Sequence, residues 1–127
     1  MFDKIFIELT ARADAEGYTF STDEDLDRWA ANLGVSWLRA LDMIGAELAR
    51  RYNNREVSYE FGDSLANDLE STLISRHQRV PENGWPTLWA EVYDAFDAGE
   101  WQRKDDPDCP VKKFTDPHIA DIVSKLD

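Results

Sequence analysis

Between residues 58 and 77, polar side chains are spaced three and four residues apart, and this spacing could support chemistry. In a helix this spacing places them along one flank, where carboxylates could share a metal ion or form an acid/base pair. Helical metal sites usually add histidine at a fixed spacing, and this flank has none before His77. Two interpretations remain, a solvated face and an acidic face that docks a basic partner. The candidate partner-binding residues of the flank are Glu60, Asp63, Asn67 and Glu70, with Asp68 beside them.

The single cysteine, Cys109, lies in a charged segment that could also carry chemistry. Asp105, Asp106 and Asp108 precede it, but the glycine and the closing glutamate of a calcium loop are missing. The chain contains no glycine elbow around a serine, no phosphate loop and no dinucleotide fingerprint. We therefore expect no catalytic residue, no metal and no cofactor, and keep a small metal-dependent or cysteine enzyme as an alternative. The groups that could activate the thiol are Lys112, Lys113, His77 and His118.

Aromatic side chains are concentrated in and around a helix predicted near residues 86–98. Trp85, Trp89 and Trp101 lie at its two ends, with Phe96 among the aromatic residues between them. Aromatic stripes at helical spacing usually fill a core. The alternative is that one or two of them anchor a protein interface, where Trp and Tyr concentrate binding energy. Trp101, which follows the predicted helix end, is therefore a further candidate partner-binding residue.

Residues 26–45 resemble a helix-turn-helix, in which a glycine turn joins two short helices. In that arrangement Ser36, Trp37 and Asp42 would face the DNA groove, and only the serine has common base-reading chemistry. The preceding helix would bring four carboxylates towards the phosphates, where a DNA-binding module needs cations. We expect residues 22–52 to form a structural corner that does not bind nucleic acid, with a helix-turn-helix transcriptional regulator as the alternative. The residues that carry the resemblance are Leu26, Trp29, Ala30, Leu33, Gly34, Val35, Ala40 and Met43.

Composition and charge limit the class of protein further. The chain has 127 residues, a common size for one domain, and its 43% hydrophobic content supplies ample core material. Its formal net charge is −12, and the imbalance is greatest in residues 58–101, which hold nine acidic and two basic side chains. Such a field repels nucleic acid and anionic lipid and attracts basic proteins. Since one cysteine forms no internal disulfide, and neither a signal peptide nor a membrane-spanning stretch is visible, we expect a cytoplasmic protein.

The elements that position these residues are predicted to be helical, because apolar side chains recur at three- and four-residue spacing almost throughout. Residues 100–115 form the one long connection, and Thr115 is expected to cap the last helix. Residues 57–61 alternate as a short strand would, so a two-stranded remnant is the competing pattern there. The expected core includes Trp29, Leu33, Leu41 and Ile44. The sequence thus predicts an all-α, compact single-domain bundle (1–127) with helices near 2–15, 22–33, 36–52, 58–77, 86–98 and 116–126.

Together these features predict a small acidic protein that acts by binding another protein with a basic surface. Its size, its negative charge and its surplus of aromatic residues fit an inhibitor, an immunity-type protein or an adaptor. This interpretation involves no cofactor, no nucleic acid and no membrane, and it assigns the chain no enzymatic activity.

Overall fold

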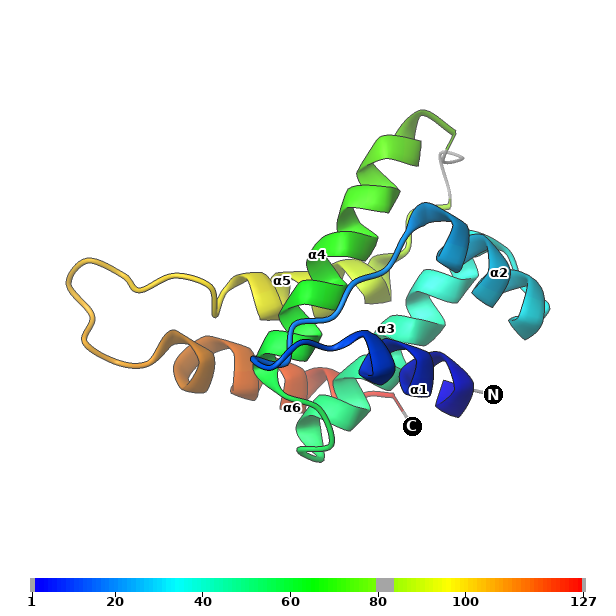
Figure 1. Cartoon of the computed structure of the whole chain (residues 1–127). Helices are drawn as coiled ribbons and strands as arrows, with labels where there is room; N and C mark the ends of the chain where they lie inside the picture. Colours follow the sequence, from blue (N-terminus) through cyan, green and yellow to red (C-terminus); the bar gives the residue numbers. More distant parts are fainter. Residues whose placement is uncertain (1, 80–83, 127) are drawn as a thin grey trace.

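Every regular element of the computed structural model is helical within the residues that it describes, 2–79 and 84–126. The predicted all-α fold is therefore confirmed (Figure 1). No helix in these two ranges is long and apolar enough to cross a membrane. The α-helices are α1 (Phe2–Arg12), α2 (Asp23–Leu33), α3 (Trp37–Asn53), α4 (Tyr59–Arg76), α5 (Thr87–Asp97) and α6 (Asp116–Ser124), with short helical turns η1 (His77–Arg79) and η2 (Val111–Thr115).

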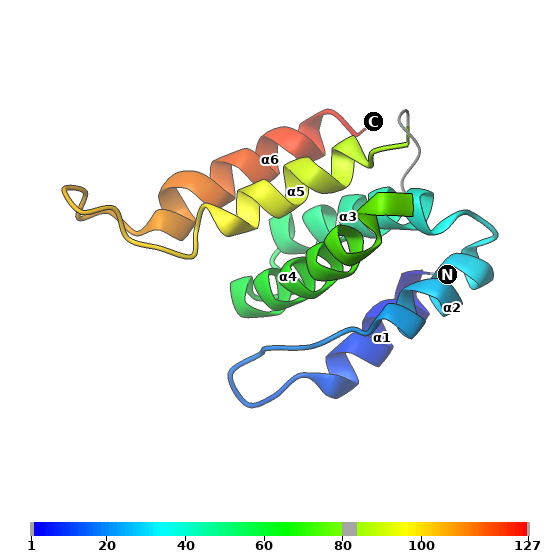
Figure 2. The ribbon, with the colours of Figure 1, turned by 90° about the horizontal axis from the view of Figure 1, so that it is seen from above.

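The helices are arranged with α3 and α4 in the middle (Figure 2). Helices α1 and α2 lie on one side of this central pair, and α5 and α6 lie on the other. Of the predicted core residues, Trp29, Leu41 and Ile44 are buried, while Leu33 is only partly buried and packs against the core. The largest fully buried side chains are Trp29, Trp89, Phe96, Leu9, Leu26, Leu41, Ile44, Leu48, Leu65, Leu69, Leu73 and Ile119.

Polar caps fix the starts of the three helices that follow one another from residue 23 to residue 76. Thr22 begins α2 with a capping box, in which its hydroxyl accepts from the Asp25 N–H and the Asp25 carboxylate accepts from the Thr22 N–H. Ser36 and Ser58 cap α3 and α4 through their hydroxyl oxygens. Gly34 ends α2 in the left-handed conformation, with φ of 73°. These local signals explain why the predicted boundaries of α2, α3 and α4 are correct to within about one residue.

Helix α5 begins without a local cap, because Pro86 has no side-chain oxygen to offer. Its first turn is capped from another helix instead. The carboxylate of Asp42 in α3 accepts a hydrogen bond from the Trp89 N–H at 3.0 Å. A negative charge at this position also complements the helix dipole. Asp42 therefore ties α5 to the central pair of helices.

The structure corrects the predicted end of the first helix. Helix α1 stops at Arg12, three residues before the predicted end. Asp14 is the cause, because its carboxylate accepts hydrogen bonds from the N–H groups of Glu16 and Tyr18, both at 3.0 Å. Aspartate often closes a turn in this way, in competition with the helix.

The connection before the last helix is also shorter than predicted, because the π-helical turn η2 runs directly into α6. Thr115 is not a helix cap. Its side chain is fully buried, and its hydroxyl donates to the Ala95 carbonyl of α5 at 2.7 Å. This contact joins the end of η2 to α5. Residues 57–61 form no strand, since Ser58 begins α4 at this point.

Candidate functional site: the acidic face of α4 and α5

Close packing of α4 on α5 brings the polar flanks of the two helices together. A Cβ atom on Gly62 of α4 would collide with the ring of Phe96 in α5, so only glycine permits this approach. The Tyr59 hydroxyl donates to the Phe96 carbonyl at 2.6 Å and joins the same two helices. The polar side chains that α4 and α5 carry on this flank are therefore brought close to one another.

Five carboxylates occupy this flank, and we call them the acidic face. Two come from α4, two from α5 and one from the residue that follows the α5 C-terminal turn. In addition to burial, Glu100 and Asp97 raise the pKa of Asp63, and Asp94 and Asp97 raise the pKa of Glu70. No ion pair among the described residues includes any member of the set. The acidic face consists of Asp63, Glu70, Asp94, Asp97 and Glu100.

Asp63 is the most perturbed member of the acidic face. Burial, followed by the neighbouring Glu100 and Asp97, raises the pKa of its carboxyl to about 8. The Oδ1 atom of Asp63 is buried and has no hydrogen-bond partner in the described part of the chain. Burial likewise raises the pKa of Asp97, and Glu100 and Asp94 add to this effect. Ionising the whole face therefore places like charges close together without a compensating cation.

Glu70 is fixed by a hydrogen bond that reaches into the core. The indole N–H of Trp89 donates to Glu70 Oε1 at 3.0 Å, and Trp89 itself is fully buried. Burial raises the pKa of Glu70, and the indole N–H acts in the opposite direction. Its carboxylate therefore stands at the boundary between core and solvent.

The other members of the predicted flank have different positions. Asn67 donates to Glu100 Oε2 at 2.8 Å, so it orients a carboxylate of the face. The Glu60 Cβ lies near Gly17 in the loop after α1, and no described contact joins Glu60 to the face. Asp68 accepts a hydrogen bond from the Ser21 N–H at 3.0 Å, on another side of the helix. The predicted flank is thus divided, and Asp63 and Glu70 are its two carboxylates that belong to the acidic face.

Trp101 directly follows Glu100 of the acidic face in the sequence. The segment between α5 and η2, to which it belongs, projects from the bundle (Figure 1). Trp101 is 55% exposed. The Arg103 guanidinium lies 3.9 Å from the ring centroids of both Trp101 and Phe114. It also donates to the carbonyl oxygens of Ala98, at 2.6 Å, and Trp101, at 2.9 Å. An exposed indole is thus held in place by a fixed cation, whereas Trp89 in the middle of α5 belongs to the core.

Three residues of the acidic face are absent from the sequence-based site, namely Asp94, Asp97 and Glu100. They carry a usable signal, because they are spaced three apart and so share one side of a helix and its last turn. What the sequence does not show is that this side meets the flank of α4. That juxtaposition depends on Gly62, whose role appears only when the two helices are packed.

The residues proposed for the helix-turn-helix alternative are engaged in contacts within the chain. Arg76 of α4 is only 4% exposed and forms ion pairs with Asp23 and Asp27 of α2. Its guanidinium also lies 5.0 Å from the ring centroid of Trp37, at the start of α3. The start of α3, which would enter a DNA groove, therefore contacts α4.

The acidic face can attract and hold cationic groups from outside the chain, because no cation of the described part neutralises it. Cys109 is exposed, and no group of three or more metal-binding side chains occurs in the described ranges. Comparisons with protein-family models, with curated proteins and with solved structures find no match to this chain.

Proposed function

We propose that this protein binds a basic partner protein through the acidic face and Trp101, as an inhibitor, an immunity-type protein or an adaptor. One observation carries the proposal: five carboxylates lie together without an ion pair in the described structure, although the chain pairs many of its other carboxylates. The repulsion between these like charges decreases when Lys or Arg side chains of a partner approach.

The physical role of the acidic face is to steer association. Complementary charge raises the rate of encounter more than it lowers the rate of dissociation, and salt weakens the effect. Trp101 has the complementary role, since exposed and well-fixed tryptophans concentrate binding energy at the centre of interfaces. Electrostatic approach and aromatic anchoring therefore act at neighbouring positions.

The first test compares two triple variants that remove the same amount of negative charge. One neutralises the acidic face (Asp94→Asn, Asp97→Asn and Glu100→Gln). The control neutralises exposed carboxylates elsewhere (Glu16→Gln, Glu24→Gln and Asp105→Asn). The probe is a dye-labelled oligolysine peptide, and its association rate is measured by stopped flow at low and high salt.

We expect the face variant to slow association several-fold and to flatten its salt dependence, while the control triple changes both much less. Equal effects of the two triples would show that only net charge matters and would refute the proposed docking surface. Circular dichroism and the free energy of unfolding verify that both variants are folded.

The second test addresses Trp101, with Trp85 as the matched control because it is also exposed. Once a natural partner is isolated, Trp101→Ala should accelerate dissociation at least several-fold, and Trp85→Ala should leave it nearly unchanged. Neither change should lower the free energy of unfolding by more than a fraction of a kcal/mol, about 0.5 kcal/mol at most. An unchanged dissociation rate for Trp101→Ala would remove this residue from the interface.

A further inference from the structure

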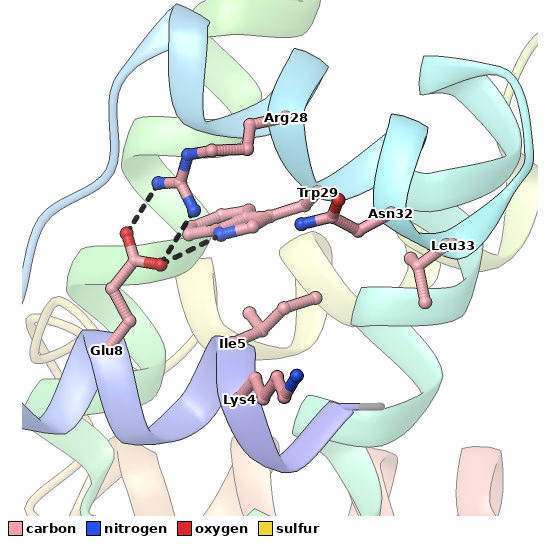
Figure 3. Close-up of a pocket in the computed structure, with 7 residues that line it drawn as sticks. All are labelled: Lys4, Ile5, Glu8, Arg28, Trp29, Asn32 and Leu33. Atoms are coloured by element: carbon pink, nitrogen blue, oxygen red, sulfur yellow. Dashed lines mark hydrogen bonds and ion pairs between the residues drawn. The ribbon is translucent and has the colours of Figure 1, made fainter.

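A second candidate site, separate from the acidic face, is a pocket of about 640 Å³ between α1 and α2 (Figure 3). Ile5, Trp29 and Leu33 provide its apolar lining. Trp29 is almost fully buried and Leu33 is partly exposed, so the lining runs from the core to the surface. Pockets of this size with apolar walls and a few polar groups are typical of small-molecule sites.

One wall of the pocket is fixed by hydrogen bonds. Glu8 accepts two from Arg28, at 2.9 and 2.6 Å, and a longer one from the Trp29 indole N–H at 3.3 Å (Figure 3). Arg12 donates to the same carboxylate at 2.6 Å from within α1. Because these side chains satisfy one another, the wall is already organised before any ligand arrives.

Two polar groups of the pocket have no such partners. The Lys4 ammonium and the Asn32 amide form no hydrogen bond or ion pair within the described residues, and Figure 3 shows them on either side of Ile5. Both are hydrogen-bond donors. Lys4 and Arg28 against Glu8 also give the pocket one net positive charge, in a chain whose net charge is −12. The local charge is thus opposite in sign to that of the protein.

We propose that this pocket binds a small organic anion. Its acidic head would accept hydrogen bonds from Lys4 and Asn32, and its apolar body would cover Ile5 and Leu33. Glu8 and Arg28 act as a fixed wall, because their charges already neutralise each other. The proposal is independent of the acidic face, which attracts ligands of the opposite charge.

The test uses two dyes with the same aromatic body. The anionic probe is 8-anilino-1-naphthalenesulfonate, and its neutral counterpart is N-phenyl-1-naphthylamine. Fluorescence titration gives the affinity of each dye for the wild type, for Lys4→Gln and for the control Lys104→Gln, which removes an exposed lysine of the projecting loop. Chemical shifts of the Trp29 indole N–H and the Asn32 side-chain amide locate the bound dye.

We expect the wild type to prefer the anionic dye by about three- to fivefold, the effect of one solvent-accessible ion pair. This preference should disappear in Lys4→Gln and persist in Lys104→Gln, with shift changes at Trp29 and Asn32. Asn32→Leu should reduce it without loss of the neutral dye. The proposal is overturned if neither dye binds, if the Lys4 and Lys104 variants behave alike, or if the shift changes lie outside the pocket.

Discussion

Carboxylates between α1 and α2 each have a cation within hydrogen-bonding distance, whereas those of the acidic face on α4 and α5 form no ion pair in the described part of the chain. The α1–α2 ion network consists of Glu8, Arg12, Asp25 and Arg28. There the Arg12 guanidinium holds the pKa of the Asp25 carboxyl well below its usual range, and Arg28 lowers the pKa of Glu8. In the acidic face, burial and neighbouring carboxylates raise the pKa of Asp63 to about 8.

This difference shows that carboxylates can either join helices within the fold or remain available to a partner at the surface. In the α1–α2 ion network, ionised carboxylates join two helices, because each negative charge meets a guanidinium. In the acidic face, ionisation adds repulsion that the described part of the chain does not offset. The first arrangement serves stability, and the second is the expected feature of a surface that receives cations from a partner.

The largest predicted effect concerns Trp29, which links the α1–α2 ion network to the core. Trp29 is 1% exposed, and its indole N–H donates to Glu8. Trp29→Ala should lower the free energy of unfolding by about 3–5 kcal/mol, as large-to-small core changes do. Urea denaturation followed by circular dichroism measures this loss. A variant as stable as the wild type would show that α2 is not held by this side chain.

The next largest effect should come from Asp25, which combines the α2 capping box with hydrogen bonds from Arg12 and Arg28. Asp25→Asn should cost about 2–3 kcal/mol at neutral pH, because charge-assisted hydrogen bonds are lost. The folded-state pKa of Asp25 is lowered, so its contribution is present above the unfolded pKa and is lost as the pH falls below about 4. Wild type and variant should therefore converge in stability in acid. A constant difference down to pH 2 would contradict this account.

A smaller effect tests the close approach that creates the acidic face. Gly62→Ala in a helix would ordinarily stabilise by up to about 1 kcal/mol. Here the new methyl group meets the buried Phe96 ring, so we expect a loss of about 1–3 kcal/mol instead. The sign of the change, measured by urea denaturation, decides the point. A gain in stability would mean that α4 and α5 are not packed as closely as described.

The last expected effect concerns Asp63 and is opposite in sign to that of Asp25. Its pKa is raised in the folded state, so the proton stabilises the fold and ionisation costs stability as the pH rises from about 4 to 8. Asp63→Asn should be stabilising at pH 7, because the amide removes the cost of ionisation, and it should flatten the decline in stability across this window. Urea denaturation at pH 5, 7 and 8.5 measures both. Wild-type stability that rises through this window would contradict the assignment.

The parts of the fold that sequence predicted well are those fixed by neighbours along the chain. Ser36, Ser58 and Gly34 act within one turn of the helix end that they specify, so their roles are visible in the sequence. Asp42 and Thr115 act across the fold, on α5, and neither role follows from local spacing. The start of α5 and the shortened connection therefore required the packed structure.

The candidate site could likewise be predicted only in part from the sequence. The spacing of Asp63 and Glu70 on one helix was visible, but the partition of the predicted flank was not. Glu60 lies beside the loop that follows α1, whereas Asp97 and Glu100 of a distant segment join Asp63. Helical periodicity gives the side of each helix on which a residue lies, but it does not tell which two sides meet. Whether the pKa of a carboxyl group is raised or lowered depends on which sides of the helices pack together.

The most direct test of the central claim is whether binding a cationic ligand removes a proton from the acidic face. Calorimetric titration of the oligolysine peptide at pH 7, in buffers of different ionisation enthalpy, measures proton exchange. Because the pKa of Asp63 is raised to about 8, its carboxyl is largely protonated at this pH, and a cation placed beside it should expel that proton. We predict proton release by the wild type and none by Asp63→Asn. Binding with the same enthalpy in every buffer would contradict the claim that the acidic face receives the cation.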